Sequence, residues 1–189
     1  MTPMVVILLI LVPICIPLIW LVVIYNRLTS VRYHLQTSWS DVDVELKRRY
    51  DLVPNLVNVV KGYAEHEKET LERLTELRNT AAANNQRPDL QSDDEMALER
   101  GLGEVMVVAE AFPDLKADAG FLSLQRELAN TEDRIAAARR FYNANVRELN
   151  QLCRTFPSSL AAGWFGFEPQ GFFEAEREAR DAPVAGVGD

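Results

Sequence analysis

Residues 4–24 read MVVILLILVPICIPLIWLVVI, and no charged side chain occurs among them. At about 1.5 Å per residue, a helix over this stretch is about 31 Å long, which matches the hydrocarbon thickness of a bilayer. The stretch therefore predicts a transmembrane helix. We expect a membrane anchor over residues 1–25, kinked at Pro13 and Pro17 because each proline removes one backbone donor.

A cleaved signal peptide is the main alternative for this segment. Such a peptide needs a basic start, a shorter apolar run and a cleavage site with small residues. Residues 1–3 contain no basic residue, and bulky residues follow the run from Ile24 to Arg27. The bulky Ile14 also argues against lipid attachment at Cys15. We therefore expect the anchor to stay attached.

The flanks of the apolar run predict its orientation. Basic side chains follow it at Arg27, at Arg32 and in residues 47–49, whereas its N-terminal side offers only the α-amino group. Basic residues near a membrane stay on the cytoplasmic side, and Trp20 and Tyr25 occupy positions typical of interfacial aromatics. We expect a single-pass protein of the inner (cytoplasmic) membrane, with its N-terminus outside and its C-terminal body in the cytoplasm.

The remainder of the chain is acidic and carries the whole formal net charge of −8. An acidic body argues against nucleic-acid binding, which needs Lys and Arg to displace counterions. The two cysteines, Cys15 and Cys153, fall in the predicted span and in a predicted helix. No disulfide is expected, which suits a reducing compartment.

Apolar residues recur every three to four positions over residues 39–78, which predicts helix. Glu67 interrupts this pattern. Pro54 either ends one helix and begins another or kinks a single long helix, and the continuous phase across it favours the kink. Residues 83–92 then predict a loop, with Ser92 as the cap of the next helix.

Two further helices are expected. One runs from Ser92 to about Ala111, weakened by Gly101 and Gly103 at about 1 kcal/mol each relative to alanine. The other, over residues 121–156, has the most regular three-four spacing in the body. We expect an all-α protein with three to four long helices after the anchor, a body domain over 26–173, and a disordered tail over 174–189.

Four strings carry a resemblance to a known family: WSDVDVELKRRYDLVPNLVNVVKGYAEHEKETL (39–71), VAEAFPDLKA (108–117), FLSLQRELANTEDRIAAARRFYN (121–143) and FPSSLAAGWFGF (156–167). In this order they resemble the LemA family of membrane-anchored helical proteins. The resemblance implies one N-terminal span followed by an elongated up-and-down helical bundle. It implies no catalytic residues, since the family has no established enzymatic activity.

Motifs for catalysis and metal binding are missing from the sequence. A di-iron bundle needs carboxylates three residues before its histidines, but Val31 precedes His34 and Tyr63 precedes His66. The chain contains neither a G-x-S-x-G elbow nor a zinc-binding H-E-x-x-H helix. We therefore expect no catalytic residue, no cofactor and no metal.

Polar residues beside the apolar pattern are the candidate structural or interaction residues. They are Arg48, Arg49, Tyr50, Pro54 and Asn55 in one cluster, Thr131 to Arg134 in the other, and Asn143 with Asn145. These side chains either form ordinary surface pairs along one helix or cross between helices and fix their register.

Aromatic residues gather near the end of the body, at Trp164, Phe165 and Phe167. They either fold back over the bundle or contact the membrane interface or a partner, because exposed aromatic patches mark contacts. A break at Pro54 gives four traverses and returns them towards the membrane, whereas a kink gives three and carries them away.

The sequence as a whole favours a non-enzymatic scaffold or adaptor that mediates protein–protein contacts at the cytoplasmic face of the membrane. The alternative is an accessory subunit that regulates a membrane protease or envelope-stress system. A third hypothesis is a ligand-binding module with a cavity between helices. We expect the bilayer and other membrane proteins as partners, and self-association through coiled-coil-like pairing of the long helices.

Overall fold

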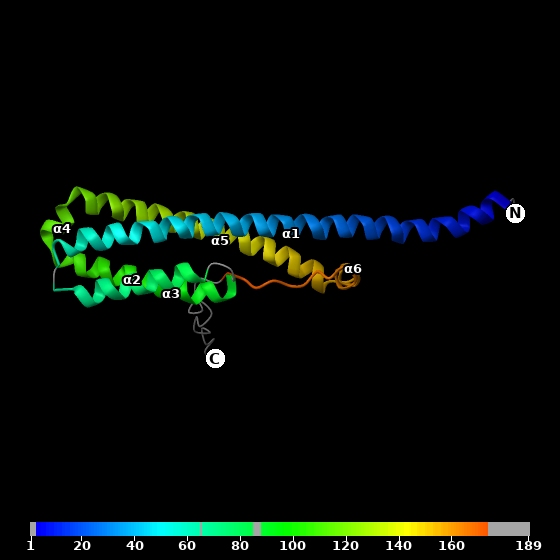
Figure 1. Cartoon of the computed structure of the whole chain (residues 1–189). Coiled ribbons are helices and arrows are strands. Elements are labelled where there is room, and N and C mark those ends of the chain that lie inside the picture. Colours follow the sequence, from blue (N-terminus) through cyan, green and yellow to red (C-terminus); the bar gives the residue numbers. More distant parts are fainter. Residues whose placement is uncertain (1–2, 65, 85–87, 174–189) are drawn as a thin grey trace, which may run out of the picture. The chain divides into compact units, whose positions relative to one another are not determined.

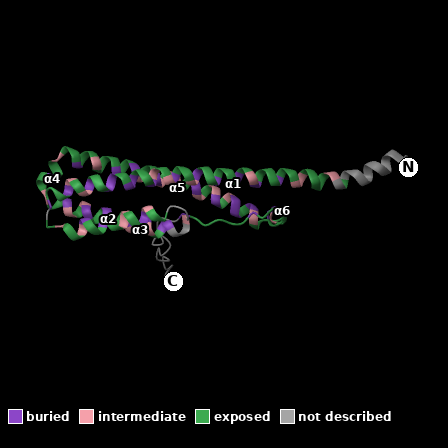
Figure 2. Cartoon of the chain, in the orientation of Figure 1, coloured by how far each residue is buried: buried purple, intermediate pink, exposed green. Residues whose placement is uncertain are grey.

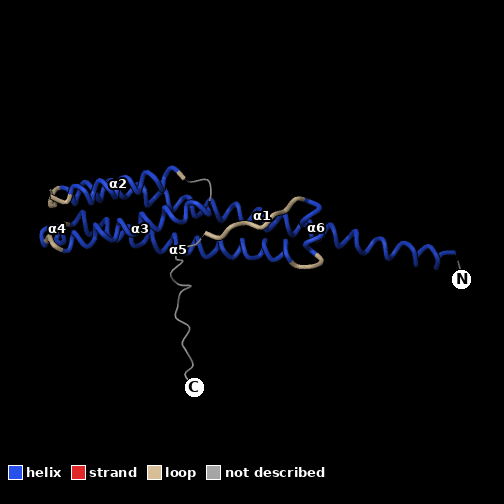
Figure 3. The backbone as a smooth tube through the Cα atoms, turned by 90° about the horizontal axis from the view of Figure 1, so that it is seen from below, coloured by secondary structure: helices blue, strands red, loops and turns tan. Residues whose placement is uncertain are grey.

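The computed structural model describes residues 3–64, 66–84 and 88–173. These residues form six helices: α1 (Pro3–Lys61), α2 (Lys68–Ala83), α3 (Pro88–Glu110), α4 (Pro113–Ala117), α5 (Ala119–Arg154) and α6 (Ser158–Phe165) (Figure 1). Figure 3 shows helices and connecting loops, without a strand in the part of the chain that is described. The predicted all-α class is confirmed. The predicted tail, 174–189, lies outside the described residues.

The chain divides into two compact units. The first unit comprises Met1–Trp39 and Phe141–Gln170, and the second comprises Ser40–Arg140 and Gly171–Asp189. Helices α1 and α5 each contribute one part to each unit. The domain boundaries expected at residues 25 and 173 stay predictions.

Helix α1 contains a segment long and apolar enough to cross a membrane, judged by length and composition. Its apolar side chains just before residue 24 are exposed: Ile16, Leu18, Ile19, Val22 and Val23 (Figure 2). From residue 15 onward, where the burial of every side chain of α1 is described, the first buried residue is Ile24. Leu28 and Val31 follow it at intervals of four and three residues on the same face. The exposed run fits the predicted anchor, and the buried face marks where packing within the first unit begins.

Pro54 lies inside α1 and does not end it. A proline has no N–H, so the carbonyl four residues earlier, that of Tyr50, loses its helical partner. Arg78 of α2 takes that place, because its Nε donates to the Tyr50 carbonyl oxygen at 3.1 Å. The backbone cost of the proline is thereby offset by a side chain from the neighbouring helix.

The helical pattern over residues 39–78 belongs to two helices, because α1 continues through Pro54 and ends at Lys61, and α2 begins at Lys68, directly after the interruption at Glu67. The amides of Tyr63 and Ala64 both donate to the Val60 carbonyl, at 3.0 and 2.9 Å, and close the last turn of α1. The buried Ala64 then occupies the corner. The first residue of α2 is preceded by Glu67, which makes no side-chain cap, so the sequence carries no capping signal there.

The predicted cap at Ser92 is also wrong. Helix α3 begins at Pro88, so Ser92 lies within its second turn and is buried. Proline suits a first helical position, where its missing N–H needs no partner. The same turn buries Gln91 and Glu95, so this end of α3 faces the interior with polar groups.

The core of the second unit is apolar and close-packed around α2 and α3, which lie side by side (Figure 1). Gly101 belongs to this contact, since a Cβ placed there would lie 2.8 Å from Leu77 Cδ1 and 3.4 Å from Leu74 Cδ1. A glycine therefore brings the two helices close together. The remaining core residues include Val42, Leu46, Val53, Leu56, Val60, Leu98, Leu102, Val105, Leu115, Phe121, Leu128 and Ile135.

The first unit pairs the early part of α1 with the later part of α5 and with α6. The rings of Trp39 and Tyr142 pack against each other at a tilt of 60°, with centroids 5.3 Å apart. Asn145 Nδ2 donates to the hydroxyl of the buried Ser38 at 3.1 Å and to the His34 carbonyl at 3.4 Å. Helix α6 ends at Gly166, whose φ of 69° is the left-handed conformation that glycine adopts without strain.

Candidate functional site

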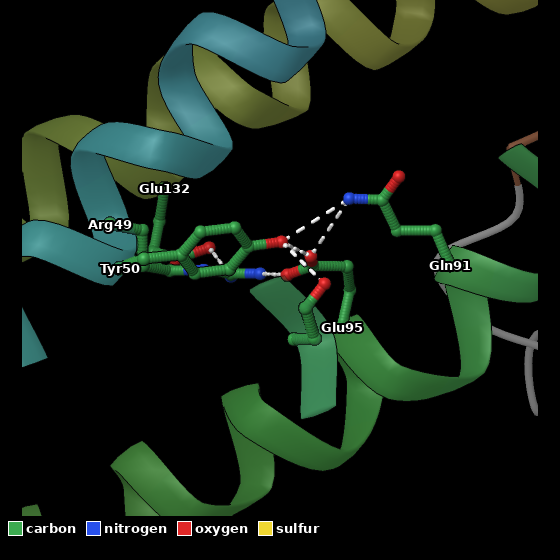
Figure 4. A network of polar contacts seen from close by, with 6 residues as sticks. Arg49, Tyr50, Gln91, Glu95 and Glu132 are labelled. Atoms are coloured by element: carbon green, nitrogen blue, oxygen red, sulfur yellow. Dashed lines mark hydrogen bonds and ion pairs between the residues drawn. The ribbon is translucent and has the colours of Figure 1, made fainter. Parts of the chain in front are cut away.

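A cluster of three charged side chains, Arg49 with Glu95 and Glu132, joins three helices of the second unit. Arg49 of α1 extends one guanidinium nitrogen, Nη1, to Glu132 of α5, at 2.8 Å from Oε1 and 3.0 Å from Oε2. The other nitrogen, Nη2, donates to Glu95 Oε2 of α3. The Arg49 side chain is 2% exposed and that of Glu95 is 7% exposed. Figure 4 shows these side chains converging from their three helices.

Two further polar side chains complete this polar network. The Tyr50 hydroxyl donates to Glu95 Oε1. The Gln91 side-chain amide donates to the Tyr50 hydroxyl at 3.2 Å and to Glu95 Oε1 at 3.3 Å (Figure 4). Glu95 thus accepts hydrogen bonds from an arginine, a tyrosine and a glutamine. Such bonds are what a buried carboxylate needs to remain in a protein interior.

The electrostatics of the polar network hold its protons in place. Burial lowers the pKa of the Arg49 guanidinium, but the charges of Glu95 and Glu132 and their hydrogen bonds outweigh it and raise the pKa overall. Burial, followed by the charge of Glu95, raises the pKa of Tyr50 well above its ordinary value. Arg49 therefore stays charged and Tyr50 stays neutral at physiological pH. Neither is prepared to exchange a proton with a substrate near neutrality.

The space beside the polar network is small. A cavity of about 30 Å³ is lined by α1, α3 and α5, together with Phe173. That volume holds a water molecule or two, whereas sites for small organic molecules have about 300–1,000 Å³. The network thus connects helices and leaves no room for a substrate.

Most of the other sequence-predicted site residues lie elsewhere. Arg48, Pro54 and Asn55 are exposed on α1. Arg134 is also exposed, and its Nη1 lies 3.6 Å from Glu45 Oε1 of α1. Such exposed pairs contribute little to stability.

The structure brings Arg49 and Tyr50 of the first predicted cluster, and Glu132 of the second, into the polar network. Asn143 is half-buried in the first unit. The role of these residues in fixing helix register stays a prediction.

Sequence reasoning missed the α3 half of the polar network, Gln91 and Glu95. The predicted helix start at Ser92 made the acidic residues after it look like a solvated first turn. Their spacing held the missing signal: 91, 95, 98, 102 and 105 continue one three-four pattern, and the last three are buried apolar residues. Polar residues in phase with a core face are candidates for buried contacts.

The predicted aromatic residues lie together in the first unit. Phe165 packs against Tyr25 of α1 with ring centroids 4.7 Å apart, and Phe167 lies 6.2 Å from the same ring. The expectation that a helix unbroken at Pro54 carries these residues away from the anchor is therefore wrong, because the chain reverses after Lys61 instead. The guanidinium carbon of Arg32 stands 4.6 Å over the Phe167 ring, which is buried. Trp164 is 76% exposed. The cluster therefore combines a packed side at Phe167 with an open side at Trp164.

An open hollow of about 650 Å³ lies in the second unit where α1 and α2 meet. Buried Ala64 and Leu71 contribute apolar surface, and exposed charged residues surround it, among them Lys61, Lys68 and Glu72. Within the described ranges, His, Cys, Asp and Glu side chains form no group of three or more suited to a metal ion. The hollow therefore combines an apolar floor with charged edges, which suits contact with another molecule.

These features define a membrane-associated, all-helical protein whose buried polar groups join helices. A family profile described as the LemA family matches residues 38–185. The chain therefore belongs to the LemA family.

Named relatives extend the similarity to most of the chain. The magnetosome protein MamQ of Magnetospirillum gryphiswaldense is 23% identical over 185 residues, which covers 85% of this chain and 68% of that protein. Magnetosome protein MamQ 1 of Paramagnetospirillum magneticum gives the same values, 23%, 85% and 68%. Protein LemA of Metamycoplasma hominis is 28% identical over 139 residues, covering 72% of this chain and 63% of that protein.

Proposed function

We propose that this protein is a membrane-anchored, non-enzymatic scaffold that presents the helices of its second unit to other proteins. The observation that carries the proposal is the polar network of Arg49, Tyr50, Glu95 and Glu132. Its Arg49 and Glu95 side chains are buried, its Glu132 side chain is partly exposed, and these charged groups are bonded to one another across three helices. A charged cluster whose groups bind one another specifies how the helices assemble. Contacts with other molecules are then left to the outer surface of the unit.

The outer surface of the second unit supports a contact role. Val44 of α1 and Val107 of α3 are large apolar side chains that are 62% and 68% exposed. The hollow between α1 and α2 adds an apolar surface with charges of both signs around it. Apolar contacts edged by charge suit a protein partner or a second copy of the chain, so self-association belongs to the proposal.

Photo-cross-linking in native membranes tests the scaffold. A photoreactive amino acid is placed at the exposed positions Val44, Thr75 and Val107 of the full chain, one at a time. Val42, which is buried two residues from Val44, is the matched control. We expect discrete intermolecular adducts from at least one exposed position and none from Val42. Uncross-linked chain at all three exposed positions would overturn the proposal.

The identity of the adducts separates the alternatives. A second copy of the chain indicates self-association, and non-peptidase membrane proteins indicate the adaptor. A peptidase that is captured reproducibly, and whose turnover changes on deletion of this protein, indicates the accessory subunit instead.

The orientation is also a proposal: N-terminus outside, body in the cytoplasm of a cell bounded by an inner membrane. It is supported by Arg27 and Arg32, which follow the apolar run. The relatives named as magnetosome proteins support an association with membranes in this family.

A further inference from the structure

Helix α6 has the reverse of the burial pattern found in helices of water-soluble proteins, because its small residues are buried and its large apolar residues are exposed. Its small residues Ser158, Ala161 and Ala162 are buried. Its large apolar residues face outward, with Leu160 53% exposed, Trp164 76% exposed and Phe165 44% exposed. Phe156, just before the helix, is exposed as well. Exposed apolar groups gathered in this way mark a contact surface.

The segment around α6 carries no charge. Residues 155–167, TFPSSLAAGWFGF, contain no Asp, Glu, Lys or Arg. Basic residues occur close by in the first unit, with Arg154 directly before the segment and Arg27 and Arg32 on α1. Arg32 already lies over the Phe167 ring, so a cation and the aromatic cluster are in contact. Uncharged aromatic surface beside arginines suits the boundary between lipid chains and phosphate headgroups.

The position of α6 in the first unit connects this surface to the anchor. Phe165 packs on Tyr25, the residue that directly follows the apolar run 4–24. Tyr25 is where an interfacial aromatic is expected if α1 spans a bilayer. The packing therefore holds α6 at the level of α1 where that bilayer ends.

We infer that α6 is a second membrane contact, which lies in the interface of the same bilayer that α1 enters. The inference rests on the proposed membrane span. Leu160 and Trp164, with Phe156 and Phe165 beside them, insert among the lipid chains to a depth of about 5–10 Å. The small residues of α6 keep it packed against its own unit. The occupant of this surface is lipid. The exposed apolar surface of α6 adjoins the end of the anchor at Tyr25, and no charged residue of α6 separates the two.

Tryptophan quenching by brominated lipids tests the inference in the full chain, reconstituted in vesicles. The first variant, Trp20→Phe with Trp39→Phe, leaves Trp164 as the single tryptophan. We expect lipids brominated near the headgroup end of their chains to quench Trp164 at least about twofold more than lipids brominated near the chain end. That order follows from the shallow depth of an interfacial helix.

Two single-tryptophan controls separate the possible failures. A variant that retains only Trp20 reports on the span itself. A variant with Tyr33→Trp as its only tryptophan reports on an exposed α1 position about 12 Å along the helix from Tyr25. We expect Trp20 to be quenched and the residue at 33 to remain accessible to acrylamide only. If Trp20 is not quenched, the proposed span fails.

Quenching of Trp20 without quenching of Trp164 overturns the inference and leaves the span intact. Two patterns then identify the state of α6. Acrylamide quenching alone places Trp164 in water, and quenching by neither agent places it against a second copy of the chain.

A substitution on the exposed face adds a direct test. Leu160→Asp, in the background with Trp164 alone, places a charge on the exposed face of α6 without disturbing a buried contact. We expect its bromine quenching to fall at least about twofold, whereas Leu160→Phe keeps the quenching. Equal quenching in both variants contradicts a role for this face in membrane contact.

Discussion

Arg49 is a permanent charge inside the second unit, and its two glutamate partners come from different helices. Moving such a group out of water is costly, and its partners repay the cost only when every bond is made. Buried ion pairs therefore do more to define one arrangement than to raise stability. At this position lysine cannot replace arginine, because two separate nitrogens bind two separate carboxylates.

Replacing Arg49 by Met should destabilise the protein by about 3–5 kcal/mol, because Glu95 is left as an unpaired buried charge. Chemical denaturation followed by circular dichroism measures the change. Arg48→Met is the matched control: its side chain is exposed, and we expect a change within about 0.5 kcal/mol. Adding Glu95→Gln to Arg49→Met should restore part of the loss. Equal stability of the Arg48 and Arg49 variants would contradict the role of the polar network.

Tyr50 makes the stability depend on alkaline pH. Its pKa is raised in the folded protein by burial and by Glu95, so the unfolded chain releases this proton first, near pH 10. The contribution is fully present below pH 10 and is lost as pH rises above it, with a slope of up to about 1.4 kcal/mol per pH unit. Tyr50→Phe should flatten this decline in denaturation measured between pH 9 and about 11. Tyr33→Phe, at an exposed position, should retain the wild-type slope.

At the scale of elements, helix α5 was predicted within two residues because its apolar spacing continues without interruption. The corner between α1 and α2 could not be read in the same way. Its apolar spacing resumes in phase at Leu71, and only Gly62 and the interruption at Glu67 distinguish it from a helix interior. Pro54 drew attention as a breaker, but the partner that makes it tolerable, Arg78, is supplied by tertiary packing. A contact between residues so far apart in the chain cannot be predicted from the sequence around Pro54.

Pro54 and Arg78 should be energetically coupled. Arg78→Met leaves the Tyr50 carbonyl without its donor and should cost about 1 kcal/mol. In a Pro54→Ala background the new amide can bond to that carbonyl, so the same substitution should cost much less. A double-mutant cycle measures the coupling, and Arg73→Met, exposed on the same helix, should show none. Additive effects of the Pro54 and Arg78 variants would contradict this account.

The two glycines of α3 should respond differently to alanine. A Cβ at Gly103 meets no atom within 4 Å, so Gly103→Ala should raise stability by about 0.5–1 kcal/mol through helix propensity. A Cβ at Gly101 lies 2.8 Å from Leu77, so that side chain must move. The stability of the Gly101→Ala variant should therefore be lower than that of the Gly103→Ala variant by about 1 kcal/mol or more. Thermal denaturation of the pair checks the order.

At the scale of the whole molecule, the apolar run, the three-four spacing of the body and the family strings together predicted the class. The uncharged run 4–24 and the acidic remainder indicated an anchored helical protein, and the family strings indicated LemA. The polar network was only half predicted. Arg49 and Tyr50 were singled out on α1 and Glu132 on α5, whereas Gln91 and Glu95 were overlooked because their burial depends on where α3 begins. Long-range polar contacts need the fold before they can be assigned.

The proposed orientation can be checked by cysteine labelling. In a chain with Cys15→Ser and Cys153→Ser, a new cysteine replaces the exposed Val107. We expect a membrane-impermeant maleimide to label it in inside-out vesicles and in lysed cells, but not in intact cells with the outer membrane opened. Labelling in those intact cells would place the body outside the cytoplasm.

The polar network has a consequence for how the chain is made. Arg49 and Glu132 are 83 residues apart, so at synthesis rates of about 5–20 residues per second the ribosome delivers the glutamate about 4–17 s after the arginine. During that interval Glu95, 46 residues after Arg49, can pair one guanidinium nitrogen. The nitrogen that Glu132 binds still needs water, so complete burial of Arg49 is unfavourable until α5 is present. Synthesis of α5 then supplies the carboxylate of Glu132. The interior around Arg49 can therefore close fully only when most of the polypeptide has been made.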